Sequence, residues 1–155
     1  NYQIQRMRTA LNPQDESLNV RLDNQKLFGQ YLMTRPFGGG IGTVGSLGKR
    51  FSPGTFLAET PPDSWYVRIW AETGIVGLAL YIVLLLFILG YGFFIIYPID
   101  DPVLRSQLIG LFCGYVGIAF ASYGNELLGQ VPTGILCHVS MAYIYLGKKL
   151  LPENA

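Results

Sequence analysis

The most informative pattern in this chain is a long run of apolar residues that carries no charge. Residues 73–99 contain no Asp, Glu, Lys or Arg, and residues 75–97 are almost wholly apolar. As a helix, these 23 residues would rise about 34 Å, which exceeds the roughly 30 Å of a bilayer's hydrocarbon core. The pattern therefore predicts a transmembrane helix over residues 75–97.

Two further apolar stretches follow this helix. A polar break at residues 98–102 leads to a second uncharged stretch, for which we predict a span over residues 106–124. Turn-forming residues then precede a third predicted span, residues 131–147, which is shorter and contains His138 and Ser140. The expected fold class is an all-α membrane protein. Three spans are few for a complete channel or transporter, so we expect a longer chain with further helices in a larger bundle.

The composition agrees with a membrane protein and excludes other classes. Half of the 155 residues are apolar and 14% are charged, against about 25% charged residues in an ordinary soluble domain. The net charge of +1 excludes a nucleic-acid binder that depends on a basic surface. The abundance of aliphatic and aromatic residues excludes a disordered chain. Two cysteines, Cys113 and Cys137, are too few for a disulfide framework or zinc cluster, and both are expected to be buried.

The basic residues of the short loops predict the orientation of the spans. Arg105 lies in the first connection and Lys148-Lys149 follow the third span, whereas the connection between the second and third spans has no basic residue. An excess of Lys and Arg marks the cytoplasmic side. Residues 1–73 are then an extracytoplasmic region of mostly helical or irregular structure, residues 74–149 hold the three spans, and residues 150–155 form a cytoplasmic tail.

Residues 40–45 (GIGTVG) match the G-x-G-x-x-G pattern of dinucleotide-binding folds letter for letter. That fold needs a strand before the motif and a helix after it. Neither the preceding Arg-Pro-Phe nor the following residues 47–54 fit these requirements. We therefore interpret the motif as a flexible glycine loop near a membrane site.

Polar and small residues in the predicted spans have structural and functional interpretations. His138 is the single histidine; it is either a neutral imidazole bonded between helices or a functional intramembrane group. Glu126 either reaches the lipid headgroups or faces an internal cavity. Gly110, Gly114 and Gly117 share one helix face, which favours close packing against another helix.

Residues 61–74 form the most informative polar stretch. After two prolines, Asp63 or Ser64 is a suitable N-cap for a helix. That helix would place Arg68 and Glu72 on one face at spacing i, i+4. The stretch thus delivers two carboxylates and a guanidinium to the membrane surface. A capped, salt-bridged interfacial helix is the structural alternative to a functional site.

The order of features over residues 17–97 resembles a known family. The features are an arginine, a short helical stretch, a glycine-rich loop, a polar pair before aromatic residues, and a Glu-x-Gly-Ile-x-Gly-Leu sequence opening an apolar helix. They correspond here to Arg21, residues 35–42 (RPFGGGIG), residues 63–66 (DSWY) and residues 72–78 (ETGIVGL). In this order the chain resembles the C-terminal part of the O-antigen ligase and O-antigen polymerase family of bacterial envelope glycosyltransferases.

The resemblance implies a multi-pass protein of the bacterial inner membrane with a periplasmic catalytic loop. Such enzymes transfer a glycan from a polyprenyl-pyrophosphate-linked donor to a glycan or lipid acceptor, without a metal or other cofactor. On this resemblance, Asp63 and Glu72 are the candidate catalytic residues, and Arg21, Arg68 and Arg35 are the candidate substrate-binding residues. A carboxylate can act as a general base, and the guanidinium fork suits a pyrophosphate group.

One departure from the family leaves the acceptor open. Ligases of this family place a His-Asn pair where this chain has Asp63-Ser64, and a carboxylate is a weaker base in water than an imidazole. Ligase and polymerase therefore both remain as hypotheses. The alternative from another class is a transporter, flippase or membrane scaffold, in which Asp63 is only a helix cap.

Overall fold

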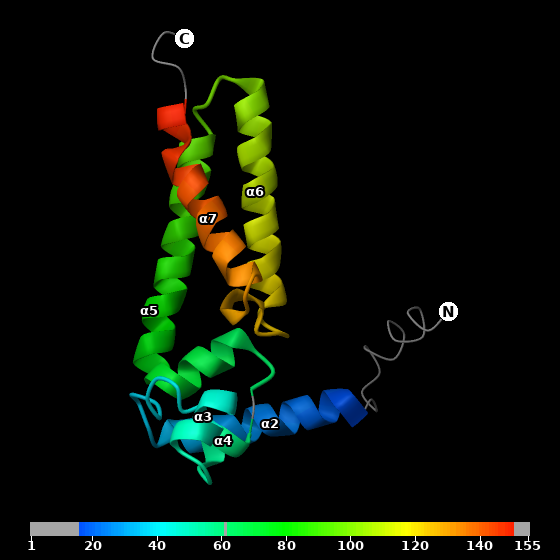
Figure 1. The fold of residues 1–155 in the computed structure, drawn as a ribbon, viewed down its shortest axis with the longest axis vertical. Helices are drawn as coiled ribbons and strands as arrows, with labels where there is room; N and C mark the ends of the chain where they lie inside the picture. The colour runs from blue at the N-terminus through cyan, green and yellow to red at the C-terminus, as the bar shows by residue number, and fades with distance from the viewer. Residues whose placement is uncertain (1–15, 61, 151–155) are drawn as a thin grey trace, which may run out of the picture. The chain divides into compact units, whose positions relative to one another are not determined.

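The computed structural model describes residues 16–60 and 62–150; within these ranges, the side chains of residues 16–18, 20–22, 148 and 150 are not described. The structure is 75% helical, with no strand among the described residues, which confirms the expected all-α class. The chain divides into two compact units (Figure 1). The N-terminal unit comprises residues 1–63 and 67–76, and the C-terminal unit comprises residues 64–66 and 77–155.

Among its described residues, the N-terminal unit contains three helices and a segment of a fourth: α2 (Glu16–Met33), α3 (Gly45–Phe51), α4 (Phe56–Glu59) and residues 67–76 of α5. Its small core is built from apolar side chains of α2, α4 and α5 and of the residue before α3: Phe28, Leu32, Val44, Leu57 and Ala71. Aromatic contacts join α2 to α4, because the Phe56 ring lies 5.5 Å from that of Phe28 and 4.7 Å from that of Tyr31, measured between ring centroids. This core holds the first part of α5 in place.

Helix α5 (Trp65–Ile96) contains a break at Gly74, whose φ of 73° and ψ of −173° are not helical. The break separates a short segment that carries two charged residues, residues 65–73, from the long apolar segment that begins at Ile75. Ile75 is also the first residue of the first predicted span.

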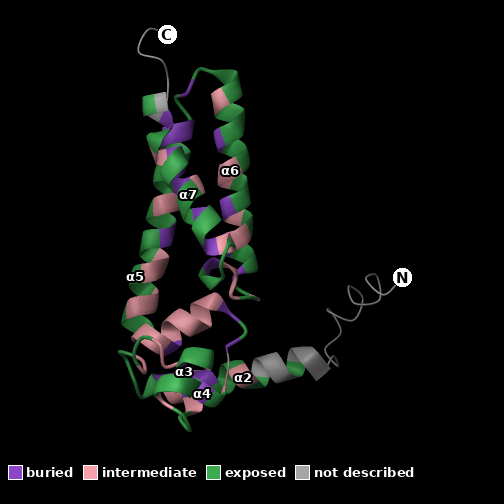
Figure 2. Cartoon of the chain, in the orientation of Figure 1, coloured by how far each residue is buried: buried purple, intermediate pink, exposed green. Residues whose placement is uncertain are grey.

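Among its described residues, the C-terminal unit contains the start of α5 up to Tyr66, residues 77–96 of the same helix, and four later helices: α6 (Pro102–Ala121), η1 (Leu127–Gly129), α7 (Thr133–Leu146) and η2 (Gly147–Leu150). A cluster of buried side chains, among them Leu85, Leu108, Tyr115 and Ile144, forms the core of this unit. Buried positions accordingly occur along α5, α6 and α7 (Figure 2). Gly92 permits a close approach, because a Cβ there would lie 3.3 Å from the Phe112 ring.

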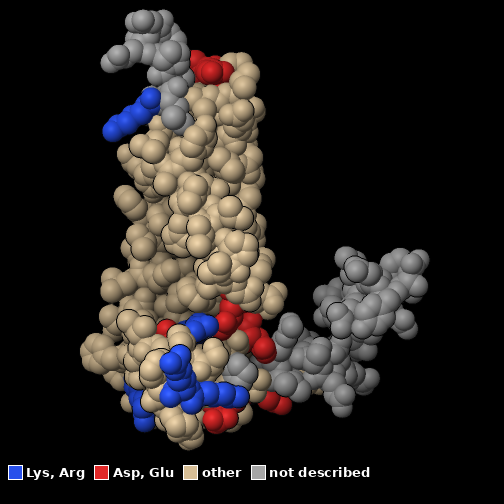
Figure 3. Space-filling view, viewed as in Figure 1, with Lys and Arg blue, Asp and Glu red and all other residues tan. Residues whose placement is uncertain are grey.

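Two helices are long and apolar enough to cross a membrane by length and composition: α5 and α6. In the most apolar 18-residue stretch of each helix, only 22% (α5) and 17% (α6) is buried within the protein. The core helix of a soluble protein, in contrast, is mostly buried. A broad uncharged surface accordingly covers the helices of the C-terminal unit (Figure 3). Exposed apolar surface of this extent is typical of a membrane or protein contact.

The second and third predicted spans differ in detail from the helices observed. Helix α6 begins four residues before the predicted start, because the Asp101 carboxylate accepts hydrogen bonds from the backbone N–H groups of Val103 (2.8 Å) and Leu104 (3.3 Å). Pro102 at the first helical position suits this start. Helix α7 has 14 residues, so it rises about 21 Å, less than the hydrocarbon core of a bilayer.

Ser122 joins three segments of the C-terminal unit. Its hydroxyl donates to the Ile118 carbonyl (2.8 Å) and accepts from the Leu128 N–H (3.3 Å). Its carbonyl oxygen accepts from the Trp65 N–H at 3.1 Å and from the Ser64 hydroxyl at 3.4 Å. Ser64 is the N-cap residue of α5, yet its side chain makes no capping hydrogen bond. Ser64 thus occupies the expected N-cap position, but its hydroxyl bonds to Ser122 and does not cap the helix.

Candidate functional site

The candidate site is centred on two charged side chains of the first segment of α5. Nε of Arg68 lies 3.4 Å from Oε1 of Glu72, and the two side chains are 23% and 15% exposed. The predicted i, i+4 pairing is thus observed. Both side chains are therefore largely shielded from water, and their neighbours Val67, Trp70 and Ala71 belong to or pack on the core of the N-terminal unit.

The position of Glu72 is unfavourable for helix stability. It lies in the last turn before the break at Gly74, where the carbonyl ends of the peptide dipoles carry partial negative charge. A carboxylate there is repelled by the helix end, and an acidic residue C-terminal to its basic partner is the less favourable order for an i, i+4 pair. Helix stability alone therefore does not account for the carboxylate at this position.

The glycine-rich loop before α3 is fixed to this helix end. The N–H of Gly39 donates to the carbonyl oxygen of Ala71 at 2.8 Å, and the N–H of Gly40 donates to that of Glu72 at 2.9 Å. These bonds satisfy two carbonyls that the break in α5 would leave without helical partners. The segment interpreted as a flexible glycine loop, residues 40–45, thus begins at a residue whose backbone is bonded to the candidate site.

This attachment requires glycine on both sides. Gly74 has a positive φ, and a Cβ on it would overlap the carbonyl group of Pro36. Gly38 also has a positive φ, and a Cβ on it would lie 2.6 Å from the Gly74 nitrogen and 2.8 Å from the Ala71 oxygen. A side chain at either position would collide with the backbone of the other segment, which explains why glycine occupies both Gly38 in the loop and Gly74 in the helix.

Asp63 and Arg35, the other candidates whose side chains are described, are not joined to this pair. Asp63 is exposed and makes no hydrogen bond or ion pair with any described residue. Arg35 is exposed, and its guanidinium carbon lies 4.8 Å from the centroid of the Tyr31 ring. Arg21 lies on α2, but its side chain is outside the described residues. The structure therefore brings together Arg68 and Glu72 of the five candidates.

A helix begins at the last residue of the G-x-G-x-x-G match. Its last glycine, Gly45, is the first residue of α3, contrary to the expectation that no helix follows. Gly48 explains how this helix packs, since a Cβ there would meet the Thr43 carbonyl and would lie 3.0 Å from the Ala58 Cα. No strand precedes the motif within residues 16–60, so the requirements of a dinucleotide fold are still not met.

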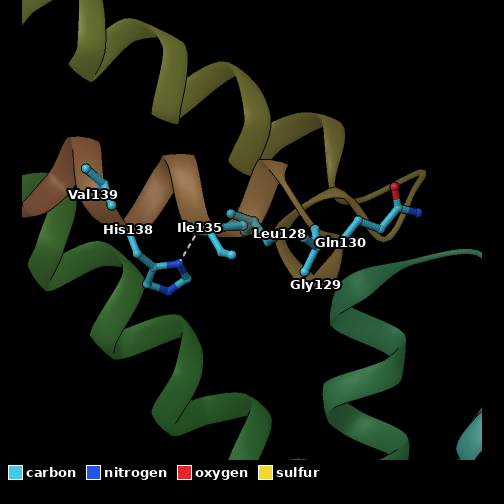
Figure 4. A pocket seen from close by; sticks show the side chains of 8 residues that line it. Leu128, Gly129, Gln130, Ile135, His138 and Val139 are labelled. Carbon is cyan, nitrogen blue, oxygen red and sulfur yellow. Dashed lines mark hydrogen bonds between the residues drawn. The ribbon is translucent and has the colours of Figure 1, made fainter.

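His138 lies on the exposed face of α7 and lines a shallow hollow of about 360 Å³ (Figure 4). Its Nδ1 shares a hydrogen bond with the Gly134 carbonyl of the same helix. The expected bond between two helices is therefore not formed. Gln130 lines the same hollow but extends away from the imidazole.

Glu126 is half-buried at the residue before η1.

The remaining small and sulfur-containing residues also differ from expectation. Gly110, Gly114 and Gly117 are exposed, and a Cβ on any of them would meet nothing within 4 Å. The described residues therefore supply no helix that packs closely against this face. Cys137 is buried as expected, whereas Cys113 is exposed on α6. No group of three or more His, Cys, Asp or Glu side chains in the described ranges is placed to hold a metal ion.

Sequence reasoning missed the backbone part of the site. The bonds from Gly39 and Gly40 join residues more than thirty positions apart, and no local spacing predicts such a pair. A usable signal was present, however: consecutive glycines at 38–40 and a glycine at the start of an apolar helix both favour close backbone approach.

Comparisons with models of known protein families, with curated proteins and with solved structures found no match.

Proposed function

We propose that this chain forms part of a membrane glycosyltransferase similar to the O-antigen ligases and polymerases. The observation that carries this proposal is the Arg68–Glu72 pair, which lies within two turns of the residue where the uncharged segment of α5 begins. A lipid-linked pyrophosphate presents its charged group at that level of a membrane. Transfer chemistry on such a donor needs a carboxylate and a cation there.

The proposed reaction joins an acceptor hydroxyl to the donor glycan. The hydroxyl oxygen attacks the anomeric carbon, and its proton passes to a carboxylate. The bond between the anomeric carbon and the pyrophosphate oxygen breaks, and the electron pair leaves with polyprenyl pyrophosphate. Fixed cations stabilise the charge that develops on this leaving group.

The proposed roles follow from side-chain chemistry. Arg68 binds the donor pyrophosphate together with Arg21, and Arg35 is a weaker candidate because it is exposed beside Tyr31. Asp63 is the proposed general base, since it is exposed to an incoming acceptor. Glu72 orients Arg68 and is the second candidate for proton transfer.

The proposed location is the bacterial inner membrane, with residues 1–73 in the periplasm. The membrane part is supported by α5 and α6, which are long and apolar enough to span. The orientation is supported by the basic residues at Arg105 and at positions 148–149. On this topology the candidate site faces the compartment in which the proposed glycan transfer takes place.

Complementation of a deletion strain with the full-length protein tests the function. Glycan chain length and glycan attachment to lipid are read separately, because a polymerase changes the first and a ligase the second. Glu72→Gln should abolish the rescue. Glu59→Gln is the matched control, because Glu59 forms a 3.9 Å ion pair with Lys49 in the same unit but outside the site.

Full rescue by Glu72→Gln and by Asp63→Asn would contradict the enzyme proposal. A transporter or flippase predicts a different result, in which the lipid-linked glycan accumulates on the cytoplasmic side when the protein is absent.

A further inference from the structure

Two large apolar side chains on the glycine-rich loop are almost fully exposed. Phe37 is 75% exposed and Ile41 is 87% exposed. They flank Gly38, Gly39 and Gly40, whose backbone is the part of the loop that is fixed to α5. Exposed apolar side chains on an anchored loop are not accounted for by packing within the N-terminal unit.

The anchor places this loop at the start of the apolar segment of α5. Gly38 approaches Gly74 so closely that a Cβ on Gly38 would lie 2.6 Å from the Gly74 nitrogen. Gly74 is followed directly by Ile75 and Val76, which belong to the same unit and are also exposed. Four exposed apolar residues thus lie next to one backbone contact: two from the loop and two from α5.

The charge and aromatic character around the loop fit a lipid surface. Arg35 is exposed two residues before Phe37, and its guanidinium stacks on the Tyr31 ring. Basic and amphipathic aromatic side chains are typical of membrane interfaces, where the cation meets anionic headgroups and the ring lies at headgroup level. Neither Asp nor Glu occurs in residues 24–58, so no acidic side chain from this stretch opposes such a contact.

We propose that residues 37–41 insert into the outer interface of the bilayer as a second membrane anchor, with lipid as the partner of Phe37 and Ile41. This insertion depends on the membrane location proposed for α5. Side chains of this kind enter the boundary between headgroups and acyl chains, at a depth of about 5–10 Å. The anchored loop would hold the Arg68–Glu72 pair at a defined height above the lipid.

Fluorescence quenching in vesicles measures this insertion. The full-length protein, with Cys113→Ala and Cys137→Ala, carries one environment-sensitive dye on Phe37→Cys or Ile41→Cys. The vesicles contain phosphatidylethanolamine and phosphatidylglycerol with a quencher on the lipid, placed either near the headgroup or near the chain end; iodide is the aqueous quencher. Val83→Cys serves as the membrane reference, because Val83 is exposed on the apolar segment of α5.

The water reference is Thr55→Cys. Thr55 is exposed at the residue before α4, one turn from Glu59, whose exposed ion pair with Lys49 marks this face as hydrated. We expect labels at positions 37 and 41 to be quenched by headgroup-level lipid and protected from iodide. The label at position 83 should respond to lipid, and the label at position 55 to iodide.

Three results would overturn the inference. Labels at positions 37 and 41 that behave like position 55, while position 83 is quenched by lipid, would remove the loop from the membrane and leave the proposed span intact. Protection from iodide without quenching by lipid would assign the loop to a protein surface. Absence of lipid quenching at position 83 would reject the membrane location itself. Glycan transfer, measured separately, distinguishes all of these from failure of the proposed enzyme function.

Discussion

The N–H of Gly40 donates a 2.9 Å hydrogen bond to the carbonyl oxygen of Glu72, so the glycine loop is bonded to the backbone of a candidate catalytic residue. The N–H of the preceding residue, Gly39, donates in the same way to the carbonyl oxygen of Ala71, the residue before Glu72. A shift of the loop therefore moves the end of the first segment of α5, and with it the Glu72 carboxylate. The following experiments separate this positioning role from the chemistry of the charged groups.

Asp63→Asn tests the proposed general base. Because Asp63 is exposed and makes no bond with described residues, we expect the stability to change by less than about 0.5 kcal/mol. Loss of a general base should lower the transfer rate about 10²- to 10⁴-fold. The rate is measured with full-length protein and lipid-linked donor. Wild-type transfer by this variant would remove Asp63 from the mechanism.

Arg68→Ala and Arg68→Lys test donor binding. We expect Arg68→Ala to weaken donor use most and Arg68→Lys to restore part of it, because lysine keeps the charge but loses the bidentate fork. The Michaelis constant for the donor is the measurement, and Arg21 is substituted in the same way. Arg50→Ala is the control, because Arg50 is exposed and stacks on Phe51 outside the site. Equal constants for Arg68→Ala and Arg50→Ala would contradict the assignment.

Gly74→Ala tests the close approach of loop and helix. The alanine would occupy a backbone conformation that is almost confined to glycine, and its Cβ would overlap the Pro36 carbonyl. We expect a loss of about 1–3 kcal/mol in the free energy of unfolding. Gly29→Ala is the matched control on α2, where a Cβ meets nothing within 4 Å, and it should gain roughly 0.5–1 kcal/mol. Denaturant titration of the purified protein in detergent measures both, and equal stabilities would show that the contact is not required.

Asp101→Ala tests the start of α6. The substitution removes the acceptor for the N–H groups of Val103 and Leu104, so we expect a loss of about 0.5–2 kcal/mol in stability. Asp100→Ala removes the adjacent exposed carboxylate, which is not the N-cap, and should change stability by less than about 0.5 kcal/mol. Thermal unfolding followed by circular dichroism compares the two. A larger effect at position 100 would reject the cap.

Cysteine labelling tests the orientation. In a protein with Cys113→Ala and Cys137→Ala, a membrane-impermeant reagent applied to intact cells with a permeable outer membrane should modify Ser46→Cys. It should not reach Ser106→Cys, because the connection with Arg105 is expected in the cytoplasm. Lysis of the cells should make both positions reactive. The opposite labelling pattern would invert the topology.

The features that could be predicted from the sequence depend on neighbours along the chain. The Arg68–Glu72 pair follows from helical spacing, and the uncharged segment after Gly74 follows from composition. Features that depend on distant partners were missed. Ser64 has the chemistry of an N-cap, but its hydroxyl bonds to Ser122, 58 residues away. The same limit applies to Cys113, whose apolar surroundings in sequence do not show which face of α6 points outward.

The bonds from the start of α5 to Ser122 also set an order of events during synthesis. Ser64 and Trp65 leave the ribosome well before the carbonyl group to which they bond, and the hydroxyl of Tyr66 likewise waits for the Ala119 carbonyl, 53 residues later. At about 5–20 residues per second, the delay is roughly 3–12 s. In the later part of that interval the apolar part of α5 is already complete and available for insertion, while its first turn still lacks its hydrogen bonds to Ser122 and Ala119. The hydrogen bonds that join the start of α5 to the end of α6 therefore form late, after α6 has packed beside α5.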